Sequence, residues 1–265
     1  MQSGNDVSVL IRNQAGQKIL SVEDWFRLAP PKRGIVHWKD SRSAKELAKA
    51  WFRNDVLGIP EELRKLLNSV FGDIQITEAI PECIVQLDNF PGEQRNCDLV
   101  VYGYVVAAPL VLSVEAKADE PFGDHVIGAY YDEKVGTSSN VPARIQNLSA
   151  ALFGRFDSEI RALRYQLLHS AAATVIEAKN RKAAIAVFVV HEFRSPTLDQ
   201  LKILQNMADW TNFVHAFPSL REKAVGETQL LGPIYVPGGN LIPPSIPLYL
   251  GHVITQCAYL HGVKY

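Results

Sequence analysis

The chain has 265 residues, of which 47% are hydrophobic and 21% are charged, a composition typical of a soluble globular protein with a sizeable core. Its formal net charge is −1, so no global field attracts nucleic acid or an anionic membrane, and a polyanion site must be a local patch. Three widely spaced cysteines without a CxxC pair argue against a disulfide framework or a zinc site. No apolar run reaches the roughly 18 residues of a membrane-spanning helix. We therefore expect a cytoplasmic protein with no membrane partner.

The first part of the sequence predicts three helices. A short helix is expected at 21–29, with a serine cap and acidic residues in its first turn. A second is expected at 43–52, where the run ending in Glu46 has the form of a capping box. A third is expected at 60–71, because a proline opens it and its leucines fall on one stripe.

Three strands are predicted next, at 83–87, 98–104 and 107–117, where apolar and β-branched residues are separated by short turn signals. The short links indicate an antiparallel meander. The following segment, 118–142, is rich in glycine, proline and serine. A loop of that length in a compact domain is more often a lid or a binding loop than idle chain.

The remaining sequence predicts further helices and strands. Helices are expected at 142–154, 158–179 and 198–214, and strands at 184–190 and near Ile234 and Leu248. The continuous apolar run at 184–190 is typical of a strand buried on both faces and reached by a crossover connection. No segment resembles a flexible linker. We therefore expect one domain over 1–265, with a core at about 43–191 and a C-terminal elaboration at 195–265.

Charged residues end the apolar strand at 107–117. Because side chains alternate along a strand, Glu115 and Lys117 share one face. Asp98 opens the preceding strand, so pairing as a meander would bring its carboxylate near Glu115. Two carboxylates at close range repel each other unless one is protonated or both share a cation. Mg²⁺, or Mn²⁺, is the natural guest, because it binds through one or two carboxylates, water and substrate phosphate.

Asp98, followed after sixteen residues by Glu115-Ala116-Lys117, resembles the D…(D/E)xK signature of the PD-(D/E)xK, or restriction-endonuclease-like, nuclease superfamily. The predicted order of elements from 43 to 191 is similar to the αβββαβ core of that superfamily. The resemblance implies an α/β fold with a mixed central sheet flanked by helices. It also implies that Asp98 and Glu115 bind the metal, that Lys117 assists the nucleophile, and that Ala116 contributes a backbone carbonyl.

The resemblance implies two further site residues. Many members of the superfamily add an acid from the first helix, for which Glu46 is the candidate, although a capping box explains Glu46 equally well. Many also place a polar residue on the crossover helix, where Gln166 is the candidate. The sequence departs from the family pattern in having Cys97 rather than proline before Asp98, and it lacks the QxxxY motif of the RecB-like branch.

Arg161 and Arg164 lie about one helical turn apart and are candidates for phosphate contacts. A solvated helix face explains the two arginines as well as phosphate binding does.

The sequence thus predicts a Mg²⁺-dependent nuclease that hydrolyses DNA phosphodiester bonds with metal-activated water. RNA is the alternative substrate, and a homodimer is an open alternative to a monomer. A catalytically inactive protein with the same fold, binding nucleic acid or a protein partner, is the rival hypothesis. Hydrolysis of a small phosphate compound fits the same three residues.

Overall fold

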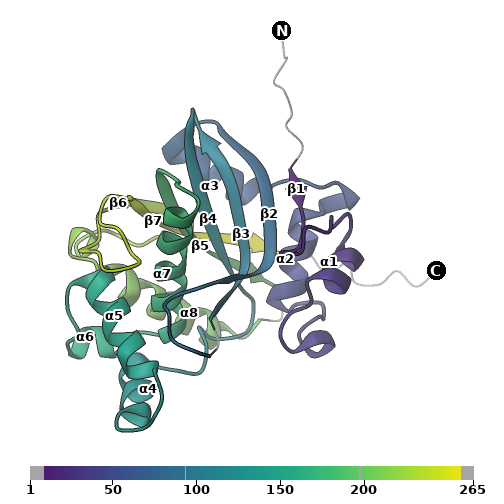
Figure 1. Cartoon of the computed structure of the whole chain (residues 1–265). Coiled ribbons are helices and arrows are strands. Elements are labelled where there is room, and N and C mark those ends of the chain that lie inside the picture. The colour runs from purple at the N-terminus through teal and green to yellow at the C-terminus, as the bar shows by residue number, and fades with distance from the viewer. Residues whose placement is uncertain (1–8, 93, 197, 258–265) are drawn as a thin grey trace.

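The computed structural model describes residues 9–92, 94–196 and 198–257, so the end of the expected elaboration at 195–265 lies outside the described residues. The described chain forms an α/β fold in which helices flank a mixed sheet (Figure 1). Seven strands make up this sheet in the order β1-β2-β3-β4-β5-β7-β6. None of the helices in the described ranges has the length and apolar character that a membrane-spanning helix requires.

The strands have the following bounds: β1 Leu10–Ile11, β2 Ile74–Val85, β3 Arg95–Val105, β4 Ala108–Lys117, β5 Ile185–Arg194, β6 Gln229–Ile234 and β7 Leu248–Gln256. The predicted antiparallel meander is confirmed, since β2 pairs with β3 and β3 with β4 in antiparallel register. β5 then lies parallel to β4. β7 lies parallel to β5. Part of the C-terminal segment therefore belongs to the central sheet.

The helices cover both faces of the sheet. On one face lie α1 Val22–Leu28, α2 Ser43–Trp51 and α3 Glu61–Phe71. On the other face lie α4 Ile127–Lys134, α5 Val141–Phe153, α6 Ser158–Arg161, α7 Tyr165–Asn180 and α8 Gln200–His215. Short 3₁₀ helices cover Gly34–Val36, Arg53–Asp55 and Pro218–Leu220.

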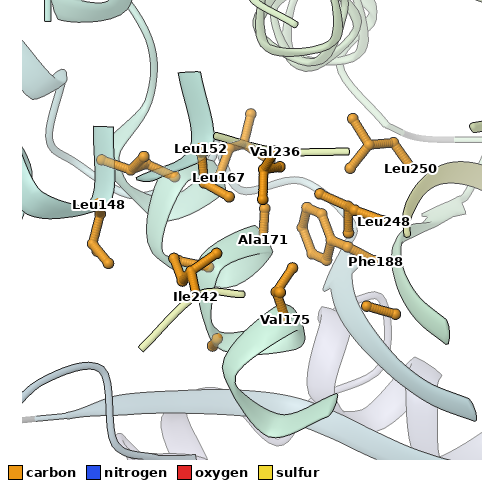
Figure 2. Close-up of a cluster of buried hydrophobic side chains, with 14 of the residues drawn as sticks. Leu148, Leu152, Leu167, Ala171, Val175, Phe188, Val236, Ile242, Leu248 and Leu250 are labelled. Carbon is orange, nitrogen blue, oxygen red and sulfur yellow. The ribbon is translucent and has the colours of Figure 1, made fainter. Parts of the chain in front are cut away.

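Each face of the sheet carries its own hydrophobic core. The core under α1, α2 and α3 includes Trp25, Trp51 and Leu63 packed against strand residues such as Leu112. The core on the other face packs α5 and α7 against β5 and β7, as Figure 2 shows for Leu152, Ala171, Phe188 and Leu248. Alternation along the strands therefore places apolar residues in both cores.

Two expectations for the second half were wrong. The segment 118–142 contains the helix α4 and is not a continuous loop. The expected helix at 158–179 is divided into α6 and α7, because residues 163–165 bond to another segment instead. The N–H of Ile127 donates to the Leu163 carbonyl at 2.9 Å, and the N–H of Tyr165 donates to the His125 carbonyl at 3.0 Å. These tertiary bonds replace the helical bonds that would have continued the helix.

Candidate active site

Asp98 and Glu115 lie opposite each other on neighbouring strands. Leu99 pairs with Val114 in the β3–β4 ladder, and the next step of an antiparallel ladder places Asp98 beside Glu115. The Asp98 carboxylate also accepts a hydrogen bond from the backbone N–H of Ala116 at 2.8 Å. The structure therefore brings together Asp98, Glu115 and Ala116, which the sequence separates by sixteen residues.

Glu115 is 1% exposed and is surrounded by donors. Its Oε1 accepts from Lys117 Nζ at 2.9 Å and from Gln166 Nε2 at 2.6 Å. Its Oε2 accepts from Ser170 Oγ at 3.2 Å and forms an ion pair with the Arg95 guanidinium. Gln166 and Ser170 lie one helical turn apart on α7, so the crossover helix presents two donors to the end of β4.

The ion pairs set the protonation of Glu115 and Lys117. Burial alone would raise the pKa of Glu115, but the charges of Arg95 and Lys117 overcome it and hold that pKa below its ordinary value. Burial alone would lower the pKa of Lys117, yet Glu115 and Asp98 raise it above its ordinary value. Glu115 is thus a carboxylate and Lys117 an ammonium over the whole physiological range.

Glu82 is a third acid at this site, and sequence reasoning missed it. Pro81 pairs with Leu99 and Cys83 with Cys97, so Glu82 stands opposite Asp98 on β2. Its backbone has φ +48°, a left-handed conformation that is strained for a residue other than glycine. The one signal in the sequence is a charged residue that interrupts an otherwise apolar run.

Arg95 also lies outside the predicted site, although it begins β3 only three residues before Asp98. We refer to Glu82, Arg95, Asp98, Glu115 and Lys117 as the acid cluster. β2, β3 and β4 lie side by side (Figure 1), and the cluster occupies one end of this meander. It contains three carboxyl groups and two cations, so the carboxyl groups are in excess.

The excess of acid appears in two raised pKa values. Burial, followed by the charge of Glu115, raises the pKa of Asp98 from 3.8 to about 7. Burial, followed by the charge of Asp98, raises the pKa of Glu82 from 4.5 to about 8. Asn96 donates to Glu82 Oε2 at 2.5 Å, which lowers that pKa without cancelling the shift. The two cations therefore neutralise Glu115 but leave Asp98 and Glu82 without an opposite charge of their own.

Glu46 is not bonded to the acid cluster. It lies on α2, and its Oε1 accepts from the Ser41 N–H at 2.9 Å and from Lys49 Nζ at 3.0 Å. Its Oε2 accepts from the Cys257 thiol at 3.6 Å. Glu46 thus reaches back to the turn before its own helix, as a capping side chain does, although the bond goes to Ser41 rather than to Ser43.

The structure pairs Arg161 and Arg164 with carboxylates away from the acid cluster. Arg161 forms an ion pair with Asp132 at 2.6 Å, and Arg164 with Asp209 at 2.8 Å. Gln166, two residues after Arg164, is by contrast bonded directly to Glu115. Of the three candidates placed on the expected crossover helix, the structure bonds Gln166 alone to a residue of the acid cluster.

The donor chemistry of the acid cluster suits a hard divalent cation. Asp98 and Glu82 are carboxyl groups whose pKa values rise because they are buried close to other acids, and a shared cation is the usual remedy for such repulsion. Within residues 9–92, 94–196 and 198–257, however, no group of three or more histidine, cysteine or acidic side chains is arranged as a ready-made metal cage. A cation held by one or two carboxylates, water and substrate requires no such cage.

Comparison with known proteins gives a family but no function. The family described as "Domain of unknown function (DUF6946)" matches residues 18–257. No curated protein and no solved structure matches the chain.

Proposed function

Because the chain belongs to the DUF6946 family, whose function is unknown, we propose a function from the site itself: a Mg²⁺-dependent nuclease with a restriction-endonuclease-like core, for which Mn²⁺ can replace Mg²⁺. One observation carries the proposal: Asp98, Glu115 and Lys117 converge at the end of an antiparallel meander. The order α3, β2, β3, β4, α7, β5 supports it, since this is the αβββαβ order of the superfamily that the signature resembles.

Asp98 and Glu115 are the proposed metal ligands, with Glu82 as a third acid beside them. A bound divalent cation would lower the pKa of its water and stabilise the charge that develops on a phosphodiester. Asp98 suits this role because its pKa is about 7. A cation that binds near neutral pH would displace the proton of this carboxyl group. Glu115 would exchange its contact with Arg95 for the cation.

The other residues of the site position the reacting groups. Lys117 is 4% exposed and held at 2.9 Å from Glu115, so its ammonium would orient the attacking water or balance charge on phosphorus. Gln166, at 2.6 Å from the same carboxylate oxygen, fixes the orientation of Glu115. Phosphoryl transfer demands mainly positioning and electrostatic stabilisation, so this small set of residues suffices.

The test measures cleavage of single-stranded DNA, duplex DNA and RNA with Mg²⁺ or Mn²⁺, together with metal binding by calorimetry. We expect Glu115→Gln to lose metal binding and roughly 100-fold or more in cleavage. Lys117→Met should lose cleavage but retain most metal binding. Glu133→Gln is the control, because Glu133 is exposed and pairs only with its neighbour Lys134. Absence of cleavage on every substrate with both metals would refute the nuclease.

A second candidate is a catalytically inactive protein that keeps this fold and binds nucleic acid or a protein partner. The observation that favours it is the complete pairing of Glu115, whose oxygens are already engaged by Arg95, Lys117, Gln166 and Ser170. On this hypothesis Arg95 takes the place of a metal permanently. Calorimetry separates the two candidates, since the inactive protein would bind neither Mg²⁺ nor Mn²⁺ at the cluster.

DNA is the proposed substrate, with RNA as the alternative. A homodimer would allow two such sites to act on two strands, and sedimentation with and without DNA tests that arrangement. Hydrolysis of a small phosphate compound needs the same residues, and a screen of phosphodiesters beside the nucleic acids distinguishes it.

A further inference from the structure

A cavity of about 260 Å³ lies beside the acid cluster on the face covered by α5 and α7. Arg95 and Asn96 connect the cavity with the acid cluster. Both line the cavity, and Arg95 pairs with Glu115 while Asn96 donates to Glu82. The side chains of Arg95 and Asn96 would therefore lie between a ligand in this cavity and the carboxyl groups of Glu115 and Glu82. No role has been assigned to the cavity so far.

Three residues of the cavity wall carry a buried polar atom that lacks a hydrogen-bond partner among the described residues. These atoms are Arg95 Nε, Asn96 Oδ1 and His169 Nδ1. Buried polar groups in proteins are nearly always paired, and an unpaired one is unfavourable by about 1–3 kcal/mol. Arg95 Nε is a donor and Asn96 Oδ1 an acceptor, so a ligand with both kinds of group would complement this wall. A nucleobase edge has both kinds of group, and a phosphate supplies further acceptors.

Aromatic rings form another part of the wall. Tyr130 and Tyr165 line the cavity with ring centroids 5.3 Å apart. Tyr130 is held flat against His125, at 3.9 Å between centroids and 10° between planes. Tyr165 and His169 make a T-shaped contact, with 4.7 Å between ring centroids. Rings fixed in this way by their neighbours provide a platform on which a planar base can stack.

Cations complete the wall. Lys32, which is exposed, stands with Arg95 and Arg144 around the cavity, and Arg144 is held in place by Asp88 at 2.6 Å. A chain with net charge −1 has no broad basic surface for a duplex, and Arg161 and Arg164 are paired with acids. Arg95 is paired with Glu115, but its Nε lacks a hydrogen-bond partner among the described residues and is a donor for a phosphate at this wall.

We propose that this cavity binds one unpaired nucleotide, with its base against Tyr130 and Tyr165 and its phosphate toward Lys32 and Arg95. The proposal rests on the proposed nuclease function and names its substrate class: nucleic acid with an unpaired nucleotide next to the bond that is cut. At about 260 Å³ the cavity is slightly smaller than the roughly 300–1,000 Å³ of pockets for drug-sized ligands. This size is of the order of a single nucleotide.

The test is calorimetric titration of the whole chain with deoxyadenosine monophosphate, deoxyadenosine or inorganic phosphate, in EDTA so that no metal-dependent step occurs. We expect the monophosphate to bind at least tenfold more tightly than either fragment. Tyr130→Leu and Tyr165→Leu should weaken its binding by roughly 5- to 100-fold, the range of base stacking on an aromatic side chain, and should leave phosphate binding unchanged.

Lys32→Glu changes an exposed residue of the cavity wall and no core residue, and its fold is checked by circular dichroism. It should weaken binding of both the monophosphate and inorganic phosphate by about fivefold. Lys65→Glu is its matched control, since it makes the same charge change on α3, at the other face of the sheet. Equal binding of the monophosphate and inorganic phosphate, or wild-type affinity in all three cavity variants, would overturn the proposal.

The outcomes separate this proposal from the nuclease itself. Nucleotide binding that Tyr130→Leu abolishes, without cleavage under any metal condition, supports the cavity and refutes the nuclease. Cleavage at equal rates on duplex and single-stranded DNA, without nucleotide binding in EDTA, supports the nuclease and refutes the cavity. If both proposals hold, single-stranded substrates are cut faster than duplex, and Tyr130→Leu reduces that preference.

Discussion

The sheet carries two buried clusters of charged residues, and they differ in how their charge is balanced. The second, which we call the β5–β7 cluster, consists of His191, Glu192 and Arg194 on β5 with His252 and Thr255 on β7. Glu192 Oε2 is bonded to His252 Nε2 and to Arg194 Nη2, both at 3.0 Å. Burial alone would raise the pKa of Glu192, but these partners lower it below its ordinary value.

The acid cluster shows the opposite pattern. Its two cations neutralise Glu115, while the pKa values of Asp98 and Glu82 rise to about 7 and about 8. A site that folds with surplus acid is less stable than one that balances its charges, and strongly raised pKa values of this kind mark functional sites more often than structural ones. The charge of Glu192 in the β5–β7 cluster is balanced by its neighbours, whereas the surplus acid of the acid cluster supports the proposal that this site holds a ligand.

The largest effect that we expect is a loss of stability when the β5–β7 cluster loses its carboxylate. Glu192→Gln removes the charge that balances Arg194 in a buried site, and breaking a buried pair on one side is typically destabilising by about 3–5 kcal/mol. Because Arg194 also pairs with Glu227 at 2.7 Å, we expect the lower end, about 3 kcal/mol. Urea unfolding measures this change. Cleavage per folded molecule should be unaffected. A loss of cleavage would show that the β5–β7 cluster takes part in the reaction.

Asp98→Asn should act in the opposite direction. The change removes one of the three carboxyl groups of the acid cluster. It keeps an oxygen that can accept a hydrogen bond from the Ala116 N–H. Metal-free protein at pH 8 should gain stability on the order of 2 kcal/mol, because one pKa unit corresponds to about 1.4 kcal/mol and solvent screens part of the shift of this half-buried group. Thermal unfolding in EDTA measures the gain. Cleavage should fall sharply in the same variant, and a protein that is both destabilised and active would contradict the assignment.

The pH dependence of stability should separate the clusters as well. Asp98 and Glu82 bind protons more tightly in the folded chain than at their ordinary pKa values of 3.8 and 4.5, so they lower stability as pH rises toward about 7 and about 8. Buried His191 has a pKa near 3 instead of 6.5, so it raises stability with pH only below about 6.5. Between pH 6.5 and 8.5 we expect the melting temperature in EDTA to fall.

The slope of this fall is at most about 1.4 kcal/mol per pH unit for each proton released. Glu82→Gln should flatten it above pH 7, whereas Glu133→Gln, at an exposed ion pair, should not change it. A melting temperature that is constant or rising over this range would show that the acid cluster carries no surplus charge.

The smallest expected effects come from single hydrogen bonds. Ser170→Ala removes one of the several partners of Glu115 and should lower stability by about 0.5–1 kcal/mol. Thr255→Val removes the partner of His191 Nε2 at 2.8 Å, and the Nδ1 of that ring already lacks one among the described residues, so a loss of about 1.5 kcal/mol is expected. Parallel denaturant titrations compare the two. Equal losses of stability would mean that the remaining partners of Glu115 do not compensate for the hydrogen bond lost from Ser170.

Much of the fold follows from local patterns in the sequence. The meander 83–117, the buried strand at 184–190 and the helix at 60–71 all have regular periodicity and clear turn or capping residues, and each is present with shifted ends. The failures lie where tertiary bonds decide the backbone. The helix α4 and the break before α7 depend on bonds between residues 125–127 and 163–165, which no local pattern encodes.

By itself the sequence placed Glu115 and Lys117 on one face of a strand, because side chains alternate along it, and predicted that pairing as a meander would bring Asp98 near Glu115. Gln166 was indicated by the resemblance to the nuclease superfamily, many members of which place a polar residue on the crossover helix. Only the tertiary structure placed Glu82 and Arg95 beside them, bonded Glu46 elsewhere and formed the cavity beside the acid cluster. The reason is physical: periodicity specifies the face of a strand, whereas charge balance and cavities depend on which distant side chains meet across it.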